Sequence, residues 1–132
     1  MNRWVVYQRE RFPLAAHAPL VAAFSASAVC FSSLLRGHVA LPSPVALVVA
    51  FVTSFLFFLQ LRIADEFKDA EDDARFRPYR PVPRGLVTLG ELGCLGAGAA
   101  VIQLGLALWL DASLVWLLAP SWVYLVLTTQ EF

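Results

Sequence analysis

Long runs of apolar residues constrain this 132-residue chain more than any other feature of its sequence. Three runs cover Leu14–Leu35, Val45–Leu61 and Leu92–Leu110, and a shorter one covers Leu114–Leu127. About 20 consecutive apolar residues allow an α-helix to cross the hydrocarbon core of a bilayer. We therefore expect an all-α fold, a polytopic transmembrane helix bundle with about four helices over residues 14–35, 45–64, 89–110 and 114–130.

The composition indicates one domain, over residues 1–132, embedded in a lipid bilayer. Apolar residues make up 59% of the chain and charged residues 15%, whereas soluble proteins average roughly 45–50% and 25%. A small soluble domain buries only about two-thirds of its surface, too little to cover so many apolar side chains. Ten basic and ten acidic residues cancel, so no net field attracts a nucleic acid. The sequence therefore disfavours both a soluble globule and nucleic-acid binding.

The Lys and Arg residues predict how the chain is oriented. Nine of the ten precede the first apolar run or lie between the second and the third, and only Arg36 lies between the first and the second. Cytoplasmic loops of membrane proteins are enriched in these residues. We expect a multi-pass protein of the inner or plasma membrane, with its N-terminus and the loop 65–88 in the cytoplasm.

Six of the ten acidic residues follow the second apolar run closely. If its helix continues at about 100° per residue, five carboxylates share roughly a third of the circumference. These are Asp65, Glu66, Asp69, Asp72 and Asp73, while Glu71 points away. Like charges at this spacing repel, which favours a bound cation, and Mg²⁺ is held by carboxylates, waters and substrate phosphates. A solvated acidic loop is the alternative.

A basic, proline-rich turn follows the acids. Three prolines between Pro78 and Pro83 restrict the backbone, which would hold Arg80 and Arg84 at defined positions, and Gly85 supplies a turn before the next apolar run. Guanidinium groups match phosphate oxygens bidentately. Acids that bind a metal beside such a turn suggest a diphosphate site.

These two segments resemble the first aspartate-rich motif and the following turn of the UbiA superfamily of intramembrane prenyltransferases. The family pattern is Asn-Asp-x-x-Asp-x-x-x-Asp, followed by Arg-Pro-x-Pro-x-Gly. Asp65 takes the Asn place, Glu66 the first Asp place, and Asp69 and Asp73 the other two. Four residues match the turn: Arg80, Pro81, Pro83 and Gly85.

The resemblance implies a Mg²⁺-dependent transfer of a polyprenyl group from a prenyl diphosphate to an aromatic or lipid-like hydrophobic acceptor within the membrane. It implies that four carboxylates take part in catalysis: Asp65, Glu66, Asp69 and Asp73. Of these, Glu66, Asp69 and Asp73 would bind the metal. Arg80 and Arg84 would bind the diphosphate.

The chain departs from the family pattern in two ways. Asp replaces Asn at position 65 and Glu replaces Asp at position 66, which keeps oxygen ligands but adds charge and a methylene. The family also uses a second aspartate motif, and only three acids follow Gly85: Glu91, Asp111 and Glu131. We therefore expect the N-terminal half of a larger prenyltransferase, incomplete for catalysis without a C-terminal half or a second copy.

Two other interpretations stay open. One is a non-catalytic membrane interaction or assembly protein, which the missing second motif favours. The other is an enzyme similar to the CDP-alcohol phosphotransferases, whose pattern requires Asp-Gly where Asp65 is followed by Glu66. Diphosphate-dependent binding of Mg²⁺ separates the prenyltransferase from the non-catalytic protein.

Overall fold

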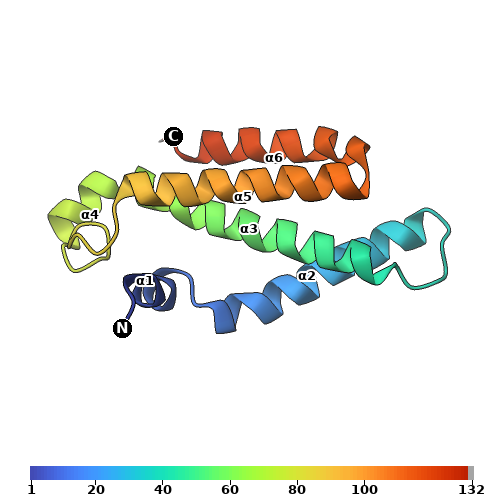
Figure 1. The fold of residues 1–132 in the computed structure, drawn as a ribbon, viewed down its shortest axis with the longest axis horizontal. Coiled ribbons are helices and arrows are strands. Elements are labelled where there is room, and N and C mark those ends of the chain that lie inside the picture. Colours follow the sequence, from blue (N-terminus) through green and yellow to red (C-terminus); the bar gives the residue numbers. More distant parts are fainter. Residues whose placement is uncertain (131–132) are drawn as a thin grey trace.

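The computed structural model describes residues 1–130, so Glu131 and Phe132 lie outside the described residues. The described chain consists of helices joined by turns and loops (Figure 1). The helices are α1 (Arg3–Arg11), α2 (Leu14–Leu35), α3 (Pro44–Lys68), α4 (Ala70–Phe76), α5 (Leu89–Leu110) and α6 (Val115–Thr128), with one 3-10 turn at Ala112–Leu114 before α6. The all-α fold predicted from the apolar runs is confirmed.

Three of the described helices, α2, α3 and α5, are long and apolar enough to cross a membrane. Helix α6 is apolar but has 14 residues, fewer than the roughly 20 that a perpendicular span needs. The expected fourth helix at 114–130 is thus present in a shorter form. These apolar helices identify a membrane-embedded helical bundle.

Helices α3 and α5 begin at residues that satisfy the free N–H groups of a first turn. The Ser43 hydroxyl accepts a hydrogen bond from the backbone N–H of Ala46, 3.2 Å away, and Pro44 occupies the first turn. Thr88 and Glu91 form a reciprocal capping box, with distances of 3.2 Å and 2.9 Å between each side chain and the other residue's backbone nitrogen. Such caps typically stabilise a helix by about 1 kcal/mol.

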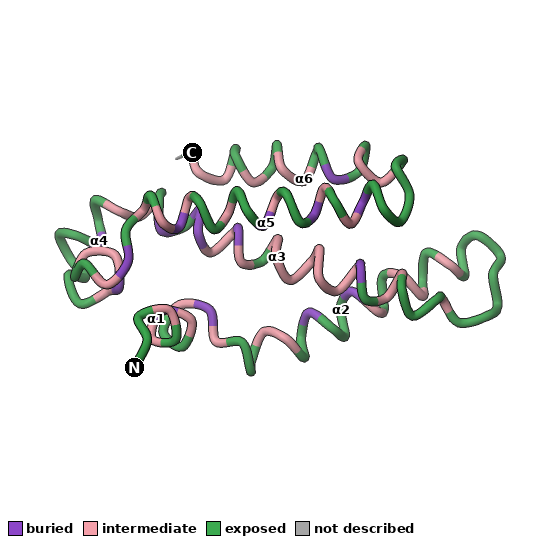
Figure 2. The backbone as a smooth tube through the Cα atoms, in the orientation of Figure 1, coloured by how far each residue is buried: buried purple, intermediate pink, exposed green. Residues whose placement is uncertain are grey.

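Helix α3 is the centre of the bundle and contacts α2, α5 and α6. Helices α3 and α5 lie side by side in Figure 1, and buried residues occur on both of them in Figure 2. Two glycines of α5 face α3 closely: a Cβ at Gly93 would lie 3.5 Å from Phe67, and one at Gly96 would lie 3.7 Å from Ile63. Small residues are a common means of close approach between membrane helices.

A buried amide connects three helices within the apolar part of the bundle. Gln103 of α5 is fully buried, and its amide nitrogen donates to the backbone oxygen of Thr53 in α3 at 3.1 Å. Its amide oxygen accepts a hydrogen bond from the indole N–H of Trp122 in α6 at 2.9 Å. The one strongly polar side chain of α5 outside its first turn therefore links α3, α5 and α6.

Helix α1 lies at the same end of the bundle as α4 (Figure 1). Its Tyr7 is buried in a small apolar cluster with Ile63, Val87 and Leu92. No helix was predicted over these residues. The chain thus places α1, the end of α3, α4 and the loop 77–88 together, outside the apolar part of the bundle.

Candidate functional site

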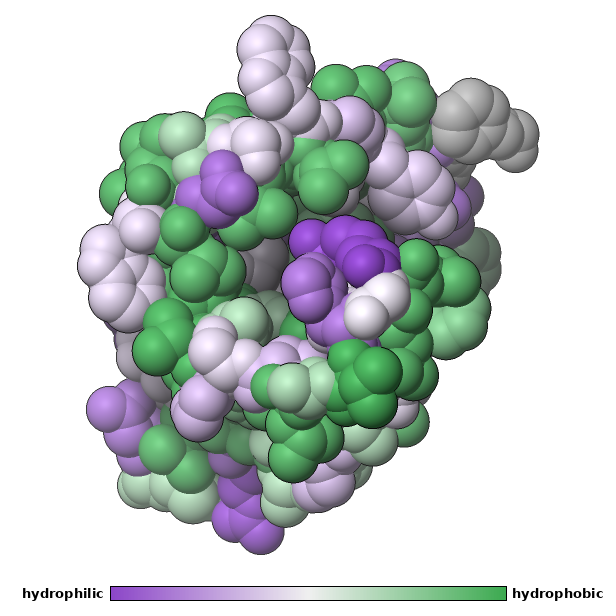
Figure 3. Space-filling view, turned by 90° about the vertical axis from the view of Figure 1, so that its right-hand side faces the viewer, coloured by the Kyte–Doolittle hydropathy of each residue, from purple (hydrophilic) through white to green (hydrophobic). Residues whose placement is uncertain are grey.

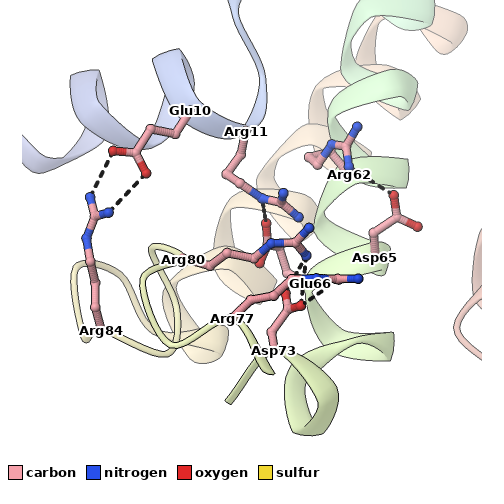
Figure 4. Close-up of polar contacts among 9 residues, drawn as sticks. All are labelled: Glu10, Arg11, Arg62, Asp65, Glu66, Asp73, Arg77, Arg80 and Arg84. Atoms are coloured by element: carbon pink, nitrogen blue, oxygen red, sulfur yellow. Dashed lines mark hydrogen bonds and ion pairs between the residues drawn. The ribbon is translucent and has the colours of Figure 1, made fainter. Parts of the chain in front are cut away.

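Charged side chains from α1, α3, α4 and the loop 77–88 meet at this end of the bundle (Figure 4). We call this set the arginine–carboxylate cluster. It comprises five arginines and four carboxylates: Arg11, Arg62, Arg77, Arg80, Arg84, Glu10, Asp65, Glu66 and Asp73. Each carboxylate accepts a hydrogen bond from at least one of these arginines, so the set is held together mainly by opposite charge.

Asp73 of α4 is the most extensively paired carboxylate. It is 1% exposed, and one Arg80 nitrogen lies 2.8 Å and 2.7 Å from its two oxygens, while Arg77 donates at 3.0 Å. Burial alone would raise the pKa of the Asp73 carboxyl, but the hydrogen bonds from Arg80 and Arg77 outweigh burial and hold this pKa below its usual range. The same hydrogen bond raises the pKa of Arg80. Both groups are therefore charged at neutral pH.

Glu66 near the end of α3 is paired with an arginine that the sequence did not assign to the site. Its side chain is 1% exposed, and Arg11 of α1 donates to one of its oxygens through Nε. Tyr7 lies nearby on α1, and burial, followed by the charge of Glu66, raises the pKa of the Tyr7 hydroxyl. Helix α1 is thus an integral part of the site.

Arg84 points away from the buried carboxylates and toward α1 (Figure 4). Its guanidinium donates to both oxygens of Glu10, at 3.1 Å and 3.0 Å, and to the backbone oxygen of Tyr79 at 2.8 Å. The turn that carries it closes through a hydrogen bond from the backbone N–H of Leu86 to the Pro81 oxygen, 2.9 Å apart. At the end of the turn Gly85 has φ +77°, a conformation that glycine adopts readily. The ordered turn predicted from the prolines and this glycine is present.

The expected bounds, a helix over 45–64 and a loop over 65–88, are wrong between residues 65 and 76, which are helical except at Asp69. The continued helix on which the carboxylate arc depended is therefore interrupted at one residue. Helix α3 ends at Lys68, Asp69 has φ −91° and ψ 5°, and α4 begins at Ala70. A break here gives Glu71, Asp72 and Asp73 the first turn of a new helix, where negative charge is stabilised by the helix dipole. In one continuous helix the same acids would extend its C-terminal end, where the dipole disfavours them.

On the two sides of the break, the predicted acids differ in how far they are exposed to solvent. Glu66 and Asp73 are buried, Asp69 is half-buried, and Asp65 is exposed with Arg62 3.3 Å away. Glu71 and Asp72 are exposed. Within residues 1–130 no three His, Cys, Asp or Glu side chains come together as a metal-binding group.

The donor chemistry of the predicted metal ligands nevertheless suits Mg²⁺, which prefers carboxylate oxygens. Both oxygens of Asp73 face Arg80, and one oxygen of Glu66 faces Arg11. A metal ion at these acids has to compete with the two arginines. Among the three predicted ligands, Asp69 takes part in none of the ion pairs found between described residues.

A cleft of about 490 Å³ opens between α1 and the proline-rich turn. It is lined by six residues: Glu10, Arg11, Tyr79, Arg80, Pro81 and Arg84. Three guanidinium groups on one cleft form a surface suited to the oxygens of a phosphate or diphosphate. Both arginines predicted to bind diphosphate, Arg80 and Arg84, therefore line one cleft, and Arg11 joins them there.

Sequence reasoning missed the residues that α1 and the start of the loop contribute. Glu10 was given no role, and Arg11 and Arg77 were counted only among the Lys and Arg residues that predict the orientation. One signal was available, because the Lys/Arg distribution predicts that α1 and the loop 77–88 lie on the same side of the membrane. It does not specify which charges pair.

No protein-family model, curated protein or solved structure matches this chain. The resemblance to the UbiA superfamily therefore rests on two segments, 65–73 and 80–85, and stays a prediction. The structure itself shows an arginine-lined cleft and buried carboxylates at one end of a bundle of apolar helices.

Proposed function

We propose that this chain binds a prenyl diphosphate at the arginine–carboxylate cluster and serves the Mg²⁺-dependent transfer of its polyprenyl group to a hydrophobic acceptor in the membrane. The observation that carries the proposal is the cleft lined by Arg11, Arg80 and Arg84 beside the buried Glu66 and Asp73. A diphosphate is the most highly charged part of such a substrate, and its prenyl chain is apolar. The cleft therefore suits the head, and the apolar helices of the bundle suit the chain.

The arginines would act on the bond between the allylic carbon and the diphosphate oxygen. As this bond breaks, its electron pair goes to the diphosphate, and Arg80 and Arg84 stabilise the added negative charge. Glu66, Asp69 and Asp73 would hold Mg²⁺, which when bound neutralises further charge on the diphosphate. The electron-rich acceptor supplies the electrons of the new carbon–carbon or carbon–oxygen bond and loses a proton, which the released diphosphate or water takes up.

The site also suggests how ligand binding is coupled to the ion pairs. Arg80 and Arg11 neutralise Asp73 and Glu66 in the ligand-free arrangement. A diphosphate that attracts these guanidinium groups would release carboxylate oxygens for the metal. Binding of metal and diphosphate would then be mutually dependent, each weak without the other.

The test is the binding of farnesyl diphosphate to the purified chain in detergent, measured by equilibrium dialysis with Mg²⁺ or with EDTA. We expect Mg²⁺ to increase the affinity at least tenfold. Asp69→Ala should abolish this increase without breaking any ion pair of the cluster, and Arg84→Ala should weaken binding roughly 10–100-fold, as expected for a lost charged hydrogen bond of about 1.5–3 kcal/mol.

Glu71→Ala is the matched control, because it removes one acidic charge from an exposed position of α4. The affinity of this variant for farnesyl diphosphate should stay within twofold of that of the unmodified chain. If Mg²⁺ does not change the affinity, or if Asp69→Ala and Glu71→Ala behave alike, the proposed site is wrong.

A non-catalytic role in membrane assembly is the second candidate. It is favoured by one observation: the two buried carboxylates already have arginine partners, as expected of a cluster that only joins helices. In that case farnesyl diphosphate and inorganic pyrophosphate should leave the thermal unfolding of the chain unchanged, with or without Mg²⁺.

A further inference from the structure

A second cavity lies at the opposite end of the bundle, among α2, α3, α5 and α6. Its volume is about 450 Å³, and the length of a 22-residue helix, roughly 33 Å, separates this end from the arginine–carboxylate cluster. Figure 3 looks onto this end and shows a mostly hydrophobic surface, hollowed near its middle beside a hydrophilic patch. The proposed function assigns no role to this cavity.

The walls of this cavity are mostly apolar and include several small side chains. Helix α2 contributes Ala28, α3 contributes Ala46 and Ala50, and α5 and α6 contribute Ala107 and Leu118 among others. Small side chains leave the space open, and ten of the fifteen lining residues are apolar; the others are Arg36 and four residues with hydroxyl groups, Ser32, Thr53, Ser54 and Ser121. The cavity therefore suits a flexible hydrocarbon chain.

One cation lies where this cavity meets the end of the bundle. Arg36, the residue after α2, lines the cavity, is exposed, and uses its Nε to donate to the Ser32 backbone oxygen at 3.3 Å. Within residues 1–130 it has no carboxylate within ion-pair distance, and no hydrogen bond is found for its two terminal nitrogens. The arginines that form ion pairs between described residues all belong to the opposite end. Arg36 thus offers free N–H donors to an anion beside an apolar cavity.

We propose that this cavity binds one acyl chain of an anionic phospholipid, with the lipid phosphate at Arg36. The ligand has to be amphipathic, because the lining is apolar and the rim is cationic. It also has to be slender: one turn of a helix about 10 Å wide and 5.4 Å long occupies roughly 420 Å³, so the cavity of about 450 Å³ holds no more than about one turn of a helix from a second copy. A bilayer lipid meets both conditions.

The experiment is native mass spectrometry of the whole chain released from detergent, with phosphatidylglycerol and phosphatidylcholine of identical acyl chains. We expect phosphatidylglycerol to bind roughly tenfold more tightly. Arg36→Gln should reduce the preference to near one, because it removes the charged hydrogen bonds to the phosphate. Arg75→Gln, which removes an exposed charge at the opposite end, should keep the preference.

A cavity-filling variant tests the acyl chain separately. Ala50→Phe should reduce the binding of both lipids, and Ala28→Phe, on an exposed position of α2, gives the same test if Ala50→Phe does not fold. Equal binding of the two lipids to the unmodified chain, or unchanged binding in the filled variants, would overturn the proposal.

Two other occupants have distinct signatures in the same spectra. Excess farnesyl diphosphate should leave the lipid bound; if it displaces the lipid, the cavity belongs to the isoprenoid and the proposal is wrong. A dimer that forms in the unmodified chain and disappears in Ala50→Phe would assign the cavity to a second copy instead. Because this site and the diphosphate cleft lie at opposite ends, either proposal can fail without the other.

Discussion

Replacing Asp73 by Ala should destabilise the chain more than any other single loss of a carboxylate in the arginine–carboxylate cluster. Asp73 is buried and is the only carboxylate of the cluster that pairs with two arginines. Removing one partner of a fully buried pair costs about 3–5 kcal/mol, because the remaining charge is left uncompensated. Here the remaining charges are partly hydrated, since the side chain of Arg80 is 21% exposed and that of Arg77 is 46% exposed.

The expected magnitude follows from these two contacts. The hydrogen bonds from Arg80 contribute about 1.5–3 kcal/mol, as is typical of a charged pair. Arg77 adds roughly 0–1 kcal/mol, because pairs near the surface contribute little. We therefore expect Asp73→Ala to lower the free energy of unfolding by about 1.5–4 kcal/mol.

The assay is reversible unfolding in mixed micelles of a mild detergent and SDS, followed by circular dichroism. Glu71→Ala, on the same short helix but exposed, should change the free energy by less than about 0.5 kcal/mol. A double-mutant cycle with Arg80→Ala should give a coupling energy of about 1.5–3 kcal/mol. If Asp73→Ala is as stable as Glu71→Ala, or if the coupling is near zero, the ion pairs do not hold the cluster together.

Three further measurements test other parts of the structure. Because the pKa of Asp73 is lower in the folded chain, its ion pairs stabilise the fold above the unfolded pKa of about 3.9 and are lost as the pH falls through the folded pKa; the pH dependence of unfolding below about pH 5 should therefore be weaker in Asp73→Asn. Gln103→Leu leaves the indole N–H of Trp122 without its acceptor and should cost about 1 kcal/mol in the same SDS assay, and a change under 0.2 kcal/mol would contradict that role. If the N-terminus is cytoplasmic, an impermeant thiol reagent added outside cells should label a cysteine at Ser43 but not one at Phe76, in a chain without its native cysteines; the reverse pattern would invert the orientation.

The long helices could be predicted because their cause is local. The run Leu92–Leu110 contains a single strongly polar side chain, Gln103, and in a bilayer every backbone N–H and C=O has to be paired within the helix. The turn at 78–85 was predictable for a similar reason, because prolines and a glycine restrict the backbone where they occur.

The arrangement of the site was not predictable in the same way. Six acids and six basic residues lie between Arg62 and Leu89, and the sequence alone does not decide which acid pairs with which base. The choice depends on α1, whose Tyr7 packs against Ile63 and Val87 and so brings Arg11 to Glu66. The helix break at Asp69 results from a similar competition, between continuing one helix and placing three acids at the start of another.

The contacts of α1 have a consequence for the order in which the chain assembles during synthesis. Its ion pairs join residues 55, 74 and 88 positions apart, through Arg11–Glu66, Glu10–Arg84 and Arg3–Glu91. At about 5–20 residues per second, Glu91 leaves the ribosome roughly 4–18 s after its partner Arg3. Helix α1 therefore lacks these partners while the two apolar helices α2 and α3 are synthesised and enter the bilayer. During this interval the surface of α1 is free to lie at the membrane interface. Helix α1 can dock fully only after the loop 77–88 and the start of α5 have been synthesised.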